Sequence, residues 1–324
     1  MSNPTERQPA WRAMLADYLG MAVVIVALIV VFSLLARNFF QAATFRTIAN
    51  EIPDRVIVAV GMTFVLIIAG IDLSVGSVLA VSGAVLGACM ALWHWPLALA
   101  IPACLAVGLA CGAANGLVSV GWRIPSFIVT LGMLEVARGA AYLVTGSRTQ
   151  YIGSRIEVVA DASVLGLSLP FVLALAIVAA GQFVLSRTVF GRHLIAIGTN
   201  EEAVRLSGID PRPRKLAVFM LCGLLTALAA VVHTSRLASA NPNAGVGFEL
   251  EAIAAVVIGG TSLMGGRGSV VRSFLGVVII AILSSGLNQL GAQEPTKRVI
   301  TGAVIVAAVI ADHYRHRLGS KSQH

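Results

Sequence analysis

The chain has 324 residues, of which 57% are hydrophobic and only 12% are charged. An ordinary soluble domain carries roughly 25% charged residues, so this composition excludes a soluble domain and indicates a membrane-embedded chain. The net charge is +8, but the basic residues lie in short loops without interleaved aromatic residues, which argues against binding of nucleic acid.

The first apolar run, Tyr18 to Ala36, has 19 residues without a charge. The core of a signal peptide is shorter, and no clear cleavage site of small residues follows this run. We therefore expect a membrane span that is retained.

Apolar runs long enough to cross the bilayer, separated by turn signals, predict about ten transmembrane helices. In chain order they are 18–36, 55–71, 76–95, 97–120, 125–145, 169–187, 216–236, 251–264, 272–291 and 297–312. The run 251–264 is short and suits a partial or tilted span. The expected fold is an all-α polytopic membrane protein, with a single membrane-spanning domain over residues 1–324.

Small residues recur every four positions in two of these runs, which allows neighbouring helix backbones to approach closely. The positions are Ala100, Cys104, Gly108, Gly112 and Gly116 in one run, and Gly76, Ala80, Ala84 and Ala88 in another. The four cysteines, Cys89, Cys104, Cys111 and Cys222, also lie inside apolar runs without metal-ligand spacing. We interpret them as small buried hydrophobic residues and expect neither a metal site nor a cofactor.

Lysine and arginine are more numerous on the side of the membrane that holds both termini, which places both termini in the cytoplasm. The cytoplasmic segments are then 1–17, 188–215 and 313–324. The longest outward loop, 146–168, is too short to fold independently.

A polar stretch, GRHLIAIGTNEEAVRLSGID at 191–210, interrupts the apolar runs. Thr199 and Glu202 fit a capping box, with Asn200 as an alternative N-cap, so a helix of about two turns is predicted. Glu201 and Arg205 are spaced for an ion pair, and Gly208 can end the helix. Its narrow apolar edge is Ala203, Leu206 and Ile209. Because so short a helix is marginal alone, it must rest on its own bundle or dock on a partner.

The sequence contains no GxxxxGK[ST] phosphate loop, no GxGxxG turn and no HExxH motif, so we expect the chain not to be an enzyme and not to bind ATP by a loop of its own. Asp72, in AGIDLSVGS, is a carboxylate at a span junction, where burial at the bilayer centre costs about 2.5–3.5 kcal/mol. Asp72 and Ser74 are therefore predicted to cap a broken or re-entrant helix that begins near Leu73, to line a translocation path, or to do both. Glu135 and Arg138 are spaced for an ion pair within a span, with a proton relay as the alternative.

Three blocks in order resemble one family: AGIDLSVGS at 69–77, GRHLIAIGTNEEAVRLSGI at 191–209, and AIAAVVIGGTSLMGGRGSVV at 252–271, followed by LGVVIIAILSSGLNQLG at 275–291. They resemble the membrane subunits of ABC sugar importers, the ribose/xylose/arabinose-type permeases, over nearly the whole chain. The resemblance implies a type II-like importer permease bundle with broken or short helices, in the bacterial inner membrane among membrane lipids. It also implies three protein partners: a second permease subunit, identical or related, an ABC ATPase subunit on the cytoplasmic face and a periplasmic sugar-binding protein.

The same resemblance makes the polar stretch a coupling loop that docks on the ATPase. Carried over by position, the coupling residues are Gly191, Arg192, Gly198, Asn200, Ala203, Arg205, Leu206, Ser207 and Gly208. Candidate residues of the translocation path are Asp72, Ser74, Asn115, Ser126 and Thr130, whose polar groups either meet sugar hydroxyls or bond neighbouring helices.

The sequence departs from the family pattern at Thr199, where glycine is common, and at Arg272, where a small residue is usual. Arg272 puts close packing after the GGRG turn in question. The function expected is import of a monosaccharide, a pentose or related sugar, by alternating access. The alternative is a stand-alone secondary transporter driven by an ion gradient, with Glu135 or Asp72 as its coupling carboxylate.

Overall fold

The computed structural model describes residues 10–164, 166–293, 295–304 and 306, and most of them are helical, as predicted. The helices are α1 Ala10–Leu35, α2 Ala42–Glu51, α3 Pro53–Ile67, α4 Val75–Gly87, the π-helix η1 Ala88–Leu92, α5 Leu97–Gly121, α6 Ser126–Thr145, α7 Ser154–Asp161, α8 Leu169–Arg187, α9 Val189–Thr199, α10 Glu201–Leu206, α11 Arg212–Leu237, α12 Phe248–Ile258 and α13 Val270–Gln289. Short strands β1 Gln150–Tyr151 and β4 Ser239–Ala240 pair antiparallel, as do β2 Ser163–Val164 and β3 Leu167–Ser168.

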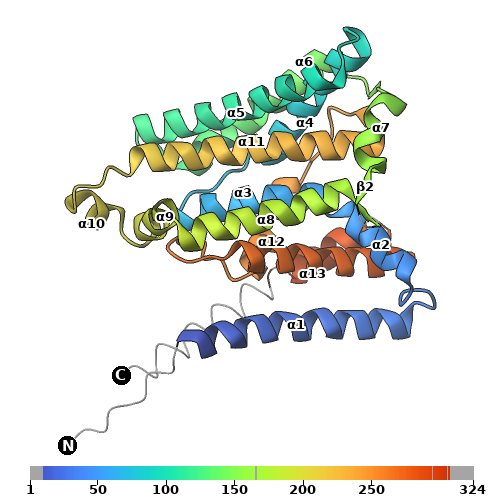
Figure 1. Ribbon diagram of the computed structural model, residues 1–324, viewed down its shortest axis with the longest axis horizontal. Coiled ribbons are helices and arrows are strands. Elements are labelled where there is room, and N and C mark those ends of the chain that lie inside the picture. Colours follow the sequence, from blue (N-terminus) through green and yellow to red (C-terminus); the bar gives the residue numbers. More distant parts are fainter. Residues whose placement is uncertain (1–9, 165, 294, 305, 307–324) are drawn as a thin grey trace, which may run out of the picture.

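The long helices run roughly side by side along one axis (Figure 1). α9 and α10 lie at one end of this bundle, where α1 also begins, and α2, α7 and the strand β2 lie at the other end. The predicted outward loop 146–168 forms α7 and the short strands. These elements pack on the bundle, and β1 pairs with β4 after α11, so the loop is stabilised by the membrane helices.

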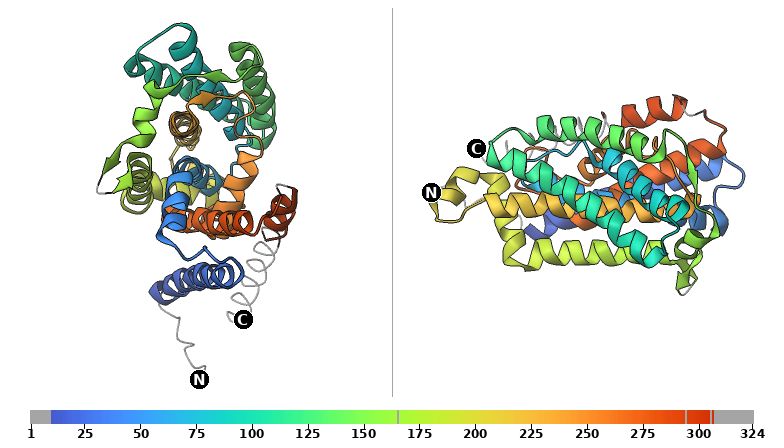
Figure 2. Two further views of the ribbon diagram at one scale, coloured as in Figure 1. Left: turned by 90° about the vertical axis from the view of Figure 1, so that its right-hand side faces the viewer. Right: turned by 90° about the horizontal axis from the view of Figure 1, so that it is seen from above.

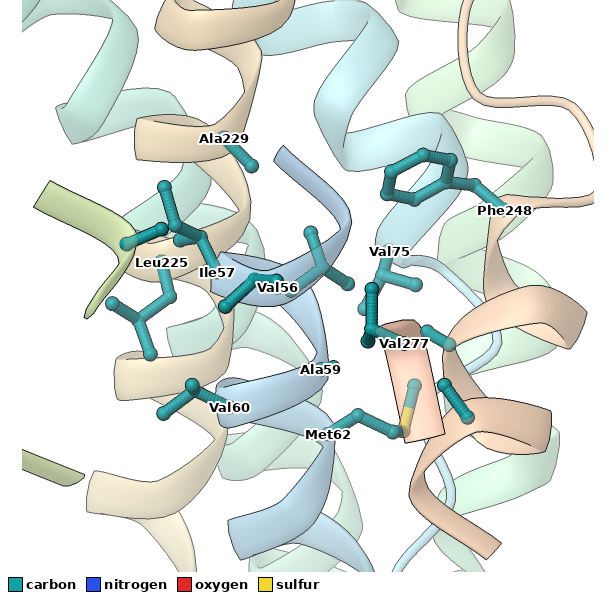
Figure 3. Packing of buried hydrophobic residues seen from close by; sticks show 14 of the residues in the cluster. Val56, Ile57, Ala59, Val60, Met62, Val75, Leu225, Ala229, Phe248 and Val277 are labelled. Carbon is teal, nitrogen blue, oxygen red and sulfur yellow. The ribbon is translucent and has the colours of Figure 1, made fainter. Parts of the chain in front are cut away.

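The helix α3 lies at the centre of the bundle, and all its residues except Arg55 are buried. Figure 3 shows its apolar side chains on different sides, with Ile57 beside Leu225 of α11 and Met62 on the side of Val277 of α13. A helix that is apolar on every side suits this position, because it meets other helices all round.

Among the described residues, seven helices are long and apolar enough to span a membrane, so the prediction of about ten spans is not confirmed. The seven segments are Tyr18–Leu35, Val75–Leu92, Leu97–Gly121, Ser126–Thr145, Leu169–Arg187, Arg212–Leu237 and Val270–Gln289. The predicted spans 55–71 and 251–264 differ because α3 has only 15 residues and α12 only 11. Both stop at segments of irregular backbone, where glycine or a left-handed residue ends the helix.

The predicted span 297–312 lies partly outside the described residues, which are helical over 295–304. The predicted cytoplasmic tail 313–324 and the first nine residues of the predicted segment 1–17 also lie outside them.

The small residues of α5 pack against α11, which confirms the predicted close approach of helix backbones. Ala100 and Cys104 are fully buried. A Cβ atom added to Gly108 or Gly112 would collide with the carbonyl oxygen of Gly223 or Phe219, respectively. Ala80 and Ala84 of α4 and Ala88 at the start of η1 are also buried. The four cysteines are free, and all but the half-buried Cys111 are buried.

We expect Gly112→Ala to destabilise the protein, because the added methyl group must push α5 away from α11. Overpacking of this kind costs about 1–3 kcal/mol. Thermal unfolding of the detergent-solubilised protein measures the effect as a lower melting temperature. The matched control is Gly121→Ala at the end of the same helix, where an added Cβ meets nothing within 4 Å. Equal melting temperatures for the two variants would contradict the prediction.

Candidate functional site

The chain between α3 and α4, residues 68–74, is an irregular segment that we call the polar break. Ala69 has a left-handed backbone with φ 57°, so the chain turns away from the axis of α3 immediately after that helix. Irregular backbone at membrane depth must be covered by protein or water that satisfies its polar groups. Here α6 supplies those groups.

Two hydroxyl groups of α6 hold the backbone of the polar break. The Ser126 Oγ accepts a hydrogen bond from the Ile71 amide at 2.9 Å. The Thr130 Oγ1 accepts from the Leu73 amide at 3.1 Å and donates to the Ile71 carbonyl at 3.2 Å. Ser126 and Thr130 lie four residues apart on one face of α6, so a single helix face fixes the path of the break.

Asp72 is 2% exposed, and its Oδ1 accepts hydrogen bonds from the Ser74 amide at 2.9 Å and from the Ser74 hydroxyl at 2.6 Å. The Asn115 Nδ2 of α5 donates to the same hydroxyl at 3.0 Å. The predicted capping is wrong in detail. The helix α4 begins at Val75, Ser74 is its N-cap residue, and neither Asp72 nor Ser74 makes a side-chain capping bond. Asp72 instead closes a turn onto Ser74, just before the helix.

The structure thus brings together all five residues that the sequence suggested for a translocation path. Asp72, Ser74, Asn115 and Thr130 are buried, and Ser126 is half-buried. The buried Asn115 Oδ1 has no hydrogen-bond partner among the described residues. A buried acceptor without a donor is costly, so this oxygen is a polar group that the described fold leaves unsatisfied.

The polar stretch forms two helices, α9 and α10, with only Asn200 between them. α10 is the short helix predicted from the sequence, whereas α9 was not predicted. The Asn200 Oδ1 accepts from the Ala203 amide at 3.0 Å, so the alternative cap is confirmed and the capping box of Thr199 is wrong. The Thr199 hydroxyl instead donates to the Ile195 carbonyl within α9.

The ion pairs of α10 also differ from the predicted one. Arg205 pairs with Glu202 at 2.6 Å, and Glu201 pairs with Lys215 of α11 at 3.0 Å. Arg205 thereby stabilises the helix internally, while Lys215 fastens it to the bundle. Gly208, with φ 85°, lies just beyond the last turn, as predicted.

The buried side of α10 is Val204, which is 7% exposed, whereas Leu206 on the predicted apolar edge is 80% exposed. Of the nine predicted coupling residues, Gly191 is buried and Gly198 is half-buried. The exposed members are Arg192, Asn200, Ala203, Arg205, Leu206, Ser207 and Gly208. These seven residues are therefore accessible at the surface.

A cavity of about 810 Å³ lies between the polar break and α10. Ile68, Gly70 and Ser126 line it on the side of the break. Glu201, Arg205, Asp210, Arg212 and Lys215 are among the charged residues that line it around α10. The cavity therefore connects the two regions that the sequence singled out separately.

The predicted ion pair between Glu135 and Arg138 is not found among the ion pairs of the described residues. Instead, the Arg138 Nη1 donates to the carbonyls of Pro242 at 2.6 Å and Ala244 at 2.8 Å. One turn further along α6, the Tyr142 hydroxyl donates to the Asn243 Oδ1 at 2.6 Å. The two bonds of Arg138 satisfy carbonyls of the irregular backbone between α11 and α12.

A buried charged cluster at the opposite end of the bundle was missed by the sequence reading. Asp54 is 1% exposed, and its Oδ2 lies 2.7 Å from the His233 Nδ1 and 3.3 Å from the Arg236 Nη2. His233 and Arg236 lie three apart on α11, but Asp54 is far away in the chain. The pattern within α11 alone therefore could not predict the cluster. No group of three or more metal-ligating side chains gathers in the part of the chain that the structure describes.

Residues 44–309 match a protein family described as the branched-chain amino acid transport system / permease component. The ribose import permease protein of Haemophilus influenzae is 40% identical over 304 residues, which cover 92% of this chain and 93% of that protein. The D-allose transport system permease protein of Escherichia coli is 35% identical, with 96% of each chain covered. The fructose import permease protein of Rhizobium meliloti is 31% identical, covering 92% of this chain and 85% of its own. No solved structure matches the chain.

One assignment follows from these findings. A family model matches most of the chain, the relatives align with it almost from end to end, and seven of the described helices are long and apolar enough to span a membrane. The chain belongs to the permease-component family of these transport systems and is a multi-pass protein of the inner membrane.

Proposed function

We propose that the chain is the membrane subunit of an ATP-driven, binding-protein-dependent importer, and that its substrate is a monosaccharide. The observation that carries the proposal is the near full-length similarity to ribose import permeases, at 40% identity over 304 residues. The family description names branched-chain amino acids. The polar break favours a sugar, because hydroxyl, amide and carboxylate groups line it and Asn115 Oδ1 is an acceptor without a donor.

In this proposal α9, α10 and the two residues that follow form the coupling segment, residues 189–208, which docks on a separate ATPase subunit in the cytoplasm. Its support is the exposure of Arg205 and Leu206 at one end of the bundle. The beginning of α1 lies at that same end, which supports a cytoplasmic N-terminus (Figure 1). The C-terminus is assigned to the same side by the distribution of basic residues. A second permease subunit completes the pore, and a periplasmic sugar-binding protein delivers the substrate.

Sugar translocation is assigned to the polar break, with Asp72, Ser74, Asn115, Ser126 and Thr130 along the path. The cavity beside it opens toward the coupling segment, so sugar leaving the break enters the cytoplasm past α10. Alternating access follows if movement of α10 opens the break on one side of the membrane while closing it on the other.

Reconstituted vesicles test this function against the rival ion-gradient transporter. We expect uptake of ribose or a related sugar that requires the ATPase subunit, the binding protein and ATP, and that persists with a protonophore. Uptake without the ATPase subunit that collapses with the protonophore would establish the rival. ATP-dependent uptake of leucine in place of sugar would overturn the substrate class alone.

Arg205→Glu is expected to abolish most ATP-dependent uptake while leaving the protein in the membrane. The change removes the cation that pairs with Glu202 and adds a third carboxylate to an exposed helix. A like-charge contact at an interface costs several kcal/mol, which is enough to weaken docking by more than about tenfold. The control, Arg205→Lys, keeps the charge and should keep most uptake. Equal uptake by all three proteins at equal expression would contradict the assignment of α10 to docking on the ATPase subunit.

Asp72→Ala is expected to reduce the folded yield at least as much as transport per folded molecule. The change leaves the buried Ser74 amide and hydroxyl without their acceptor, at a cost of about 1–3 kcal/mol. Ser77→Ala is the matched control, because the buried Ser77 hydroxyl has no partner among the described residues. Size-exclusion chromatography gives the yield, and vesicle uptake gives the transport. A normal yield with reduced transport per molecule would make the path role of Asp72 its main role.

A further inference from the structure

The C-terminal end of α9 meets two other segments through backbone contacts. The Gly266 amide donates a hydrogen bond to the carbonyl of Ile67, the last residue of α3, at 2.9 Å. Gly198 lies directly against this bond, so a Cβ atom added there would collide with the Ile67 oxygen and the Gly266 nitrogen. Only glycine fits at position 198 without moving one of these backbones.

The same contact extends to the first residues of the polar break. Gly265 has φ 83°, and a Cβ atom on it would lie 2.9 Å from both the Ala69 nitrogen and the Gly198 oxygen. Gly266 has φ 74°, and a Cβ atom on it would lie 2.5 Å from the Thr199 Oγ1. The end of α9, the end of α3 and the turn 262–267 thus pack with backbone atoms in direct contact, and only the small side chains of Ala69 and Thr199 lie beside them.

The attachments of α10 itself are the side chain of Val204, which is buried against the core, and an ion pair with α11. The pair between Glu201 and Lys215 involves side chains that are 49% and 23% exposed, respectively. Exposed ion pairs of this kind contribute about 0–1 kcal/mol. The cavity of about 810 Å³ separates the rest of α10 from the break. When α10 is displaced, the backbone contacts at Gly198 resist the movement more than the ion pair with α11 does.

We propose that Gly198, Gly265 and Gly266 form the junction that carries movement of the coupling segment to the polar break. They act as positioning residues: none of them holds sugar, but their backbones join α9 to Ile67 and Ala69. Contacts between packed backbones transmit a displacement because no long side chain lies between them to rearrange. The inference deepens the proposed function and rests on it.

Gly198→Ala tests the junction in the reconstituted complex of permease, ATPase and binding protein. We expect sugar uptake per ATP hydrolysed to fall by at least about tenfold, since small misplacements near a working site have effects of this size. Gly20→Ala in α1 is the control, because an added Cβ there meets nothing within 4 Å. Unchanged uptake per ATP hydrolysed would overturn the proposal. A proportional loss of both activities leaves that ratio unchanged and overturns it as well, since Gly198 would then act through ATPase docking alone.

Hydrogen exchange on the unmodified reconstituted complex gives an answer even if Gly198→Ala fails to fold. The Gly266 amide is bonded to the Ile67 carbonyl, so its exchange reports on the junction itself. We expect this amide to stay protected when ATP is added, while the exchange of the polar break changes. Loss of protection at Gly266, or an unchanged polar break, would overturn the proposal.

The uptake of the unmodified complex separates a failure of the proposed function from a failure of the junction. If the unmodified complex shows no ATP-dependent sugar uptake, the proposed function is wrong. If it imports sugar and the Gly198→Ala complex does so equally well per ATP, the function stands and the junction is wrong.

Discussion

In a bilayer, a backbone that leaves its helix must find hydrogen-bond partners inside the protein, and this constraint organises the molecule. The chain leaves α3 at Ile67 and begins α4 at Val75, which frees several amides and carbonyls. Ser126 and Thr130 of α6 bind part of this backbone, and Asp72 binds the amide that precedes α4. The requirement for partners therefore determines which face of α6 meets the break and where the polar residues gather.

The same constraint explains a second irregular segment. Between α11 and α12 the chain runs without a helix, and the guanidinium of Arg138 binds two carbonyls there. Gly76 packs directly against the Gly245 carbonyl, so the segment also touches the first turn of α4. Two broken regions, distant in the sequence, thus lie against each other in the bundle. Polar groups in such regions first satisfy the backbone of the protein, and any contact with substrate must use the donors and acceptors that remain unpaired.

Much of this arrangement could be predicted from the sequence because its signals are local. Apolar runs marked the seven long helices, and the spacing of Gly108 and Gly112 indicated a close helix contact. The predictions that were wrong concern features that depend on contacts between residues distant in the chain. The lengths of α3 and α12 depend on where the bundle can cover a break, and hydropathy alone extends both helices. Arg138 donates hydrogen bonds to the carbonyls of Pro242 and Ala244, which are distant in the chain, and not to its predicted partner Glu135. Arg272, whose size put close packing after the GGRG turn in question, is accommodated with its guanidinium beside Gly260.

The helix α1 differs from all the others in how little of it the protein covers. Only 6% of its apolar segment is buried, and it stands at one edge of the bundle in the left view of Figure 2. Its firmest contact is near its far end, where the Phe32 ring presses on Gly286 and lies 5.4 Å from the ring of Phe39. Along the rest of α1, Met21 is buried and Ile25, Leu28 and Ile29 pack against the core. Most of its apolar surface nevertheless faces the bilayer, so the thickness of the hydrocarbon core contributes to its tilt together with its contacts to α13.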